Sequence, residues 1–237
     1  MRTRRLGARS VAAIGVAVAL AVGAPVGGAA AQSEADPDTV VVAPASTLPV
    51  VYRVDTSDPV VFITIDDGIT RSRDALKWLQ RRKLPVTSFL TTSVARGHYR
   101  YFEKMSARGS LQNHTVSHPA FDTYGGSLTG QICPVQREIG DRTGTQPWML
   151  RPPYGAGPRL SRVHQAAASC GITHIVMWDA VVDRGRLTTW NGQQLSRGSI
   201  ILLHYTPNLK QDLRVAYRAA RDQGFTVAAL EDYLPGP

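Results

Sequence analysis

Two histidines and two neighbouring carboxylates in this sequence have the types and spacing of metal ligands. His114 and His118 stand four residues apart, and Asp66 and Asp67 are adjacent. Two imidazoles with a carboxylate are a common ligand set for zinc, and three protein ligands leave the ion a position for water or substrate. Because a bound zinc lowers the pKa of its water to about 7, such a site could supply a nucleophile for hydrolysis at neutral pH.

Further ionisable residues lie along the rest of the chain and could serve such a hydrolysis. Arg151 could hold a neighbouring carboxylate in its charged form. His204 could protonate a leaving group, a role for which histidine is the most frequent residue. Asp179 and Asp183 stand between these two residues. Such residues can act together only if the fold brings them to one place.

Short apolar runs alternate with amphipathic helical segments, which is typical of a parallel sheet built from strand–helix units. Helices are expected at 71–83 and 209–223, where apolar residues recur on one stripe. Strands are expected from Val60 to Ile65, Val86 to Leu90, Ser110 to Gln112, Trp148 to Leu150, Ile172 to Trp178, Ser199 to Leu203 and Phe225 to Ala229. These strands fit either a barrel or a doubly wound sheet.

The ionisable residues fall at the carboxyl ends of the expected strands, where parallel α/β folds form their ligand sites. The first strand is followed by the two adjacent aspartates, the third by the two close histidines, and the fourth by Arg151. Asp179 and Asp183 follow the fifth strand, and His204 follows the sixth. Each cluster alone could be an ordinary turn or polar loop. Their coincidence at one rim predicts a shared site.

Four of these clusters, in this order, resemble the signature of the polysaccharide deacetylases of carbohydrate esterase family 4, also called the NodB homology domain. That family carries T-F-D-D-G, H-[ST]-x-x-H, R-x-P-Y-G, D-x-x-D-W and L-x-H. The matching segments are Thr64 to Gly68, His114 to His118, Arg151 to Gly155 and Leu202 to His204, and the resemblance spans roughly Pro59 to Leu234. It implies an α/β fold, a distorted (β/α) barrel of about seven parallel strands in a single catalytic domain.

The resemblance assigns the metal site and the base. Asp67, His114 and His118 would bind a divalent metal, most often Zn2+ and alternatively Co2+. Asp66 would be the general base that takes a proton from the attacking water. Arg151 would keep Asp66 ionised and oriented, as a nearby cation does for a carboxylate.

The resemblance also assigns groups around the leaving amine. His204 would protonate that amine, and the backbone N–H of Tyr154 would help to stabilise the oxyanion. Leu202 would line the pocket for the acetyl methyl group, and Trp178 is a further candidate for contact with the substrate.

The acidic motif departs from the family pattern. Asp179 and Asp183 stand four positions apart rather than three, and the next tryptophan is Trp190. In the family this motif tunes the acid histidine. We therefore expect Asp183 to be the partner of His204, with Asp179 as the alternative.

The sequence predicts a hydrolase that removes N-acetyl groups from an amino-sugar polysaccharide, chitin-type oligomers or peptidoglycan, and releases acetate and a free amine. Two alternatives stay open. An O-acetyl esterase acting on acetylxylan would use the same attack, and its better leaving group would demand less of the acid. A catalytically weak carbohydrate-binding protein would have kept the metal site and lost turnover with the altered acidic motif.

The N-terminus has the pattern of an export signal. Four arginines within the first nine residues precede an apolar run from Val11 to Val22 and a small-residue exit at 29–31. We expect residues 1–31 to be a signal peptide, 32–58 an extended lead-in and 59–237 the deacetylase domain. A retained membrane anchor is the alternative, and the Arg4-Arg5 pair hints at twin-arginine export. Once cleaved, the protein would be secreted or associated with the cell wall, with no stable membrane anchor.

Loss of the signal would change the charge balance. The whole chain has a formal net charge of +9, of which the first nine residues contribute four, so residues 32–237 would carry +5. They contain no basic tract with interleaved aromatic residues, and we expect no nucleic-acid partner. The expected partner is the acetylated polysaccharide substrate, and the expected oligomeric state is a monomer.

Cys133 and Cys170 are the two cysteines of the chain. In an exported protein such a pair is expected to form a disulfide. Closing a loop of this size would stabilise the fold by about 4 kcal/mol in the chain-entropy model.

Overall fold

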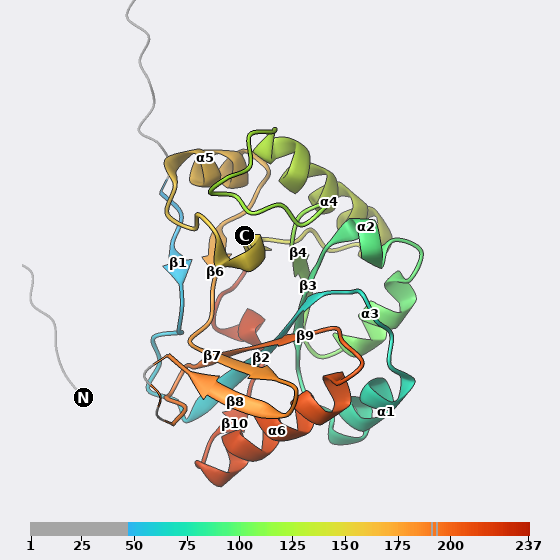
Figure 1. Cartoon of the computed structure of the whole chain (residues 1–237), viewed down its shortest axis with the longest axis vertical. Coiled ribbons are helices and arrows are strands. Elements are labelled where there is room, and N and C mark those ends of the chain that lie inside the picture. Colours follow the sequence, from blue (N-terminus) through green and yellow to red (C-terminus); the bar gives the residue numbers. More distant parts are fainter. Residues whose placement is uncertain (1–46, 191, 193) are drawn as a thin grey trace, which may run out of the picture. The chain divides into compact units, whose positions relative to one another are not determined.

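The computed structural model describes residues 47–237 except 191 and 193. Within this range, ten strands form one curled and mostly parallel sheet with helices packed around it (Figure 1). The expected α/β fold with a single barrel-like domain is thereby confirmed. The expected signal peptide and the first part of the lead-in lie outside the described residues. None of the described helices is long and apolar enough to cross a membrane.

The strands differ in length from two to eight residues. They are β1 Val50–Val51, β2 Val60–Asp67, β3 Thr87–Leu90, β4 Leu111–Asn113, β5 Met149–Leu150, β6 His174–Val176, β7 Ala180–Asp183, β8 Arg186–Thr189, β9 Ile200–His204 and β10 Thr226–Val227. Across the sheet they follow the order β1-β6-β5-β4-β3-β2-β9-β7-β8, and β10 pairs with β2. The helices are α1 Arg73–Arg82, α2 Thr92–Ala95, α3 Tyr99–Met105, α4 Leu128–Thr143, α5 Ser161–Ser169 and α6 Leu209–Asp222.

Each of the seven expected strands overlaps an observed one, and the two expected helices correspond to α1 and α6. The apolar periodicity explains this agreement, because Ala75, Trp78 and Leu79 form the buried stripe of α1. β1 is an addition to the expected set. It lies in the segment expected as a lead-in and pairs in parallel with β6, so the sheet begins before Pro59.

β7 and β8 form a hairpin in the segment of the two later aspartates, where no strand was expected. Asp179 precedes β7 and Asp183 ends it, opposite Arg186 of β8. The turn that joins β7 to β8 has positive φ at both of its residues, 48° at Arg184 and 79° at Gly185. This conformation suits the twist of a two-residue hairpin. β7 reads Ala-Val-Val-Asp, which does not alternate between apolar and polar residues, so this pattern could not reveal it.

β2 lies in the middle of the sheet because both of its faces are apolar. Ile63 and Ile65 belong to the cluster beneath α1 and α6, which we call the outer face. Phe62 belongs to the cluster that fills the inner face, together with Phe89 of β3. Because side chains alternate along a strand, Thr64 and Asp66 follow Phe62 onto the inner face.

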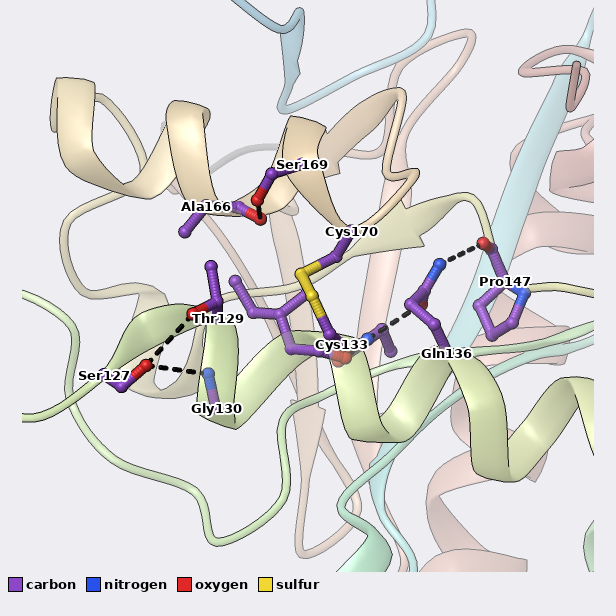
Figure 2. Close-up of a disulfide and its surroundings, with 11 residues drawn as sticks. Ser127, Thr129, Gly130, Cys133, Gln136, Pro147, Ala166, Ser169 and Cys170 are labelled. Atoms are coloured by element: carbon purple, nitrogen blue, oxygen red, sulfur yellow. Dashed lines mark hydrogen bonds between the residues drawn. A yellow bond between two sulfur atoms is a disulfide. The ribbon is translucent and has the colours of Figure 1, made fainter.

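The expected disulfide is present between Cys133 on α4 and Cys170, the residue after α5 (Figure 2). The two Cα atoms lie 4.9 Å apart and the cysteines are 37 positions apart in the chain. The bond fastens α4 to α5, which also pack against each other. It therefore constrains the helix that lies beside the histidine segment described below.

Replacing both cysteines with serine is expected to lower the free energy of unfolding by about 2–4 kcal/mol, because the unfolded chain regains the freedom that the crosslink removes. Urea denaturation of the oxidised protein and the double variant measures this difference. Serine at both positions avoids an unpaired thiol. An unchanged unfolding free energy would contradict the expected role of the bond.

Candidate metal and catalytic site

Four strands bring the expected site residues to the same end of the sheet. β2 ends in Asp66 and Asp67, and β9 beside it ends in His204, which lies in register with Asp66. His114 directly follows β4, and Arg151 directly follows β5. Since neighbouring parallel strands lie about 4.8 Å apart, these side chains come from one continuous rim.

Three donor atoms converge at this rim. Oδ1 of Asp67 lies 3.5 Å from Nε2 of His114 and 3.2 Å from Nε2 of His118. The two Nε2 atoms lie 3.1 Å apart. Ligands at about 2.1 Å from a tetrahedral ion would stand about 3.4 Å from one another, so these donors have the spacing that a single cation requires. The donor set of one carboxylate and two imidazoles therefore fits a divalent metal.

A hydrogen bond from Nδ1 of His114 fixes the orientation of its Nε2. Nδ1 lies 2.7 Å from the carbonyl oxygen of Arg151, so Nδ1–H donates to that oxygen and the lone pair of Nε2 is directed at the other two donors. Burial lowers the pKa of His114, which favours the neutral imidazole that a metal binds. His114 is therefore held in the tautomer of a ligand.

Asp67 is kept ionised in the same cluster. Burial, the largest single effect, raises the pKa of Asp67, but the hydrogen bond with His118 and the nearby His114 and His204 together hold it below its ordinary value. An ionised carboxylate is the form that coordinates a cation.

Backbone strain is concentrated around these donors. Among the described residues, six other than glycine have positive φ, and four of them lie here, at 79° for Asp67, 72° for Thr115, 63° for His118 and 59° for Tyr154. Residues other than glycine adopt this region at a cost, and such residues cluster at functional sites. The surrounding hydrogen bonds must hold these conformations in place.

Asn113 and Gln131 supply many of those hydrogen bonds. Oδ1 of Asn113 accepts the N–H of Thr115 at 2.9 Å, and its Nδ2 donates to Gln136 of α4 at 2.8 Å. Gln131, also on α4, accepts the N–H of Ser117 through Oε1 at 3.0 Å. The sequence reasoning missed both residues. A signal for this support was present in the sequence of α4. Gln131 and Gln136 lie on its buried stripe, where apolar residues would be expected.

Replacing Gln131 with leucine is expected to weaken metal binding about 10-fold, because the histidine segment loses a partner that fixes its backbone. Competition with a chromophoric chelator measures the affinity without reference to turnover. Arg137→Leu is the matched control, since this residue is exposed on the same helix. Equal affinities of both variants for the metal would exclude this role for Gln131.

Arg151 is completely buried and pairs with the carboxylate of Asp66. Its Nη1 donates to Oδ1 of Asp66 at 2.8 Å and to Oγ1 of Thr64 at 2.8 Å. Its Nε and Nη2 donate to the carbonyl oxygens of Val176 and Met177 at 3.0 and 2.9 Å. Burial lowers the pKa of Arg151, and Asp66 opposes this effect. The carboxylate of Asp66 is therefore oriented by a cation that is itself fixed in four directions.

The expected substrate contacts flank the histidines. The ring of Tyr154 is 73% exposed and lies 4.5 Å from the ring of His118, centroid to centroid. Gly155, the residue after Tyr154, lies against the ring of Trp178. A Cβ at position 155 would stand 2.9 Å from Cη2 of Trp178, so this position requires glycine. Leu202 lies in β9, two residues before His204, and is therefore on the same face of the sheet.

The structure separates the two aspartates of the altered motif. The carboxylate of Asp179 accepts hydrogen bonds from Oγ of Ser199 and from the N–H of Ile200, both at 2.9 Å, so it fastens β7 to β9. Asp183 has a side chain that is 60% exposed. β7 and β9 pair in parallel with Val181 opposite Leu202, which puts Asp183 at the level of His204 on the inner face.

Asp212 of α6 is a buried carboxylate that the sequence reasoning missed. Its Oδ1 accepts the N–H of Gly185 at 2.7 Å, which fixes the turn of the β7–β8 hairpin. Burial raises the pKa of Asp212, and the nearby Asp183 raises it further. Asp212 therefore positions the segment that presents Asp183.

The curled sheet and its rim have the fold of the family 4 carbohydrate esterases. A solved family 4 carbohydrate esterase from Bacillus anthracis has a TM-score of 0.64 and 24% identity, over 78% of this chain and 86% of that one. A peptidoglycan N-acetylglucosamine deacetylase has a TM-score of 0.65 and 20% identity, over 78% and 92%. A family 4 pseudoenzyme from Bacillus anthracis has a TM-score of 0.65 and 19% identity, over 80% and 70%. These likenesses establish the fold.

The sequence itself identifies the family. Residues 53–175 match the polysaccharide deacetylase family model. An uncharacterized protein of Streptomyces coelicolor is 38% identical over 196 residues, which cover 78% of this chain and 77% of that protein. The chain belongs to the polysaccharide deacetylase family, and the resemblance seen in its motifs is confirmed.

Proposed function

We propose that this protein is a secreted, metal-dependent deacetylase that removes N-acetyl groups from an amino-sugar polysaccharide. The observation that carries the proposal is the convergence of Asp67, His114 and His118 beside the buried pair of Asp66 and Arg151. The substrate class is chitin-type oligomers or peptidoglycan, and the products are acetate and a free amine. Peptidoglycan is favoured by one structural neighbour, which is a peptidoglycan N-acetylglucosamine deacetylase.

Asp67, His114 and His118 would hold the metal, for which we propose Zn2+, with Co2+ as an alternative. When bound, such an ion acts as a Lewis acid on a carbonyl oxygen and lowers the pKa of water. The carbonyl oxygen of Arg151 and Gln131 of α4 hold the segment that carries the two histidine donors. The site is thus preorganised for binding.

Asp66 would be the general base. Its Oδ1 is occupied by Arg151, while its Oδ2 faces the donor cluster at 3.7 Å from Nε2 of His114. The free oxygen is therefore the one that would take the proton of the attacking water. Arg151 would prevent rotation of the carboxylate, so that the same oxygen always faces the water.

His204 would donate a proton to the departing nitrogen, because an amine is a poor leaving group until it is protonated. It lies in register with Asp66 on the adjacent strand, so acid and base act from neighbouring positions. Asp183 at the same level would stabilise the protonated imidazole. The N–H of Tyr154 would donate to the oxyanion, and Leu202 would contact the acetyl methyl group.

Acetate release from three acetylated polymers would test this proposal. We expect release from N-acetylglucosamine oligomers or peptidoglycan, its loss on chelation and its recovery with Zn2+ or Co2+. Release from acetylxylan alone would establish the O-acetyl esterase instead. Saccharide binding without acetate from any polymer would establish the weakly catalytic binding protein. Activity that survives complete metal removal would contradict the proposed mechanism.

The site of action follows from the N-terminal pattern. We propose that residues 1–31 direct export, that cleavage follows Ala31, and that the deacetylase domain acts on the cell wall. N-terminal sequencing of the protein recovered from the culture medium or the wall fraction would test this. An intact N-terminus found in the membrane fraction would establish a retained anchor.

A further inference from the structure

The helices on the outer face of the sheet gather cations around one hollow. α1 and α6 lie next to each other (Figure 1), and the rings of Trp78 and Tyr217 meet between them with centroids 5.8 Å apart. These rings line a hollow of about 520 Å3 together with six cations, Arg81, Arg82, Lys210, Arg214, Arg218 and Arg221. We call these six residues the basic face. No carboxylate of the described residues lines this hollow.

The basic face is poorly neutralised by the protein. Lys210 forms an ion pair with Asp74 at 3.1 Å, and no other member has a carboxylate partner among residues 47–237 as described. α1 and α6 together carry eight cations and three carboxylates, of which Asp212 is buried and bonded to the hairpin. Repulsion between like charges opposes this arrangement. A bound anion would relieve the repulsion.

Two guanidinium groups of the basic face are held by the aromatic rings. Arg82 lies 4.1 Å above the ring of Trp78, and Arg221 lies 5.7 Å from the ring of Tyr217. Stacking leaves the N–H groups at the edge of a guanidinium free to donate to a phosphate. Because these side chains are already ordered, less conformational entropy is lost when they bind an anion.

The extent of the basic face indicates a polymer. Lys210 and Arg221 are eleven residues apart on α6, which corresponds to about 16 Å along the helix. A single phosphate contacts only a small part of this length. Trp78 is 5% exposed, so it offers no open ring on which a nucleic-acid base could stack. We propose that the basic face binds a linear polyanion whose charges are phosphate groups, independently of the deacetylase activity.

Binding of long-chain inorganic polyphosphate to the full-length protein tests this proposal. We expect Arg214→Glu/Arg218→Glu to weaken binding at least 10-fold and Arg214→Gln/Arg218→Gln to weaken it less. The matched control is Arg137→Glu/Arg197→Glu, which makes the same change in net charge at exposed positions on α4 and in the turn before β9. Binding should also weaken as salt is added, because exposed charges are screened. Thermal unfolding of each variant shows that the fold is retained.

Several outcomes would overturn the proposal. If the control variant loses as much affinity as the first variant, net charge alone explains the binding. If a phosphate-free acidic polysaccharide or vesicles with anionic lipids bind as tightly and with the same loss in the first variant, the linear phosphate polymer is the wrong ligand. If inorganic phosphate at equal phosphate concentration competes fully, the site holds single ions. Deacetylase activity is measured separately, so its absence leaves this result intact.

Discussion

Asp66→Asn is expected to lower turnover by about 10²–10⁴-fold while leaving metal affinity within about 3-fold of the original. The amide keeps the shape of the carboxylate and its Oδ1 can still accept from Arg151, but it cannot take a proton from water. Asp66 is not one of the three convergent donors, so they remain intact. Steady-state acetate release and metal titration by chelator competition measure the two quantities on the same preparation.

Asp67→Ala is the control that separates the adjacent aspartates. It removes one of the three donors, and we expect metal affinity to fall at least 100-fold together with turnover. Excess metal should restore part of its activity, whereas it should restore none in Asp66→Asn. Equal loss of metal in the two variants would show that the proposed division of roles is wrong.

Arg151→Met is expected to lower the free energy of unfolding by about 3–5 kcal/mol, because it leaves a buried carboxylate without its counter-ion. Methionine is long enough to fill much of the space over Phe89, where the guanidinium carbon now lies 4.2 Å from the ring. The carbonyl oxygens of Val176 and Met177 would also lose their donors. Urea denaturation of the metal-free variant measures the effect.

A double-mutant cycle shows whether this cost arises from the ion pair. Asp66→Asn should destabilise the fold as well, since it leaves the Arg151 cation buried without a counter-charge. The combination of Asp66→Asn and Arg151→Met removes both charges, and its cost should fall short of the sum of the single costs by at least about 1 kcal/mol. Additive costs would mean that packing around Arg151, rather than its charge, stabilises this region.

The strands and the order of the motifs could be read from local sequence. The run from Val60 to Ile65 is continuously apolar, as expected of a parallel strand buried on both faces, and Asp66 and Asp67 follow it directly. The rule that ligand sites form at the carboxyl ends of such strands then placed the aspartates and His204 at one rim. β2 and β9 bear this out, because Asp66 and His204 lie in register.

The residues that support the site could not be read in the same way. Thr64 meets Arg151 across 87 positions of sequence, and Gln131 of α4 meets Ser117 in the loop that follows β4. No local period marks such pairs, since each partner is chosen by how two distant segments pack. The disulfide was an exception because the chain contains only two cysteines.

The altered acidic motif shows the same division. Its spacing left Asp179 and Asp183 as equal candidates to accompany His204. The hairpin distinguishes them geometrically, because Asp179 is bonded to Ser199 and Ile200 while Asp183 stands at the level of His204. Register between strands is a long-range property, so it was beyond the reach of a spacing argument.

The sequence by itself determined the family, the order of the catalytic motifs and the strand ends that carry them, because these depend on residue type and local periodicity. The tertiary structure alone decided which side chains meet. It packed α1 against α6 and so joined two cations of α1 to four cations of α6, far along the chain, in the basic face. A net charge is a sum over the chain, whereas a binding surface depends on where folding places each charge.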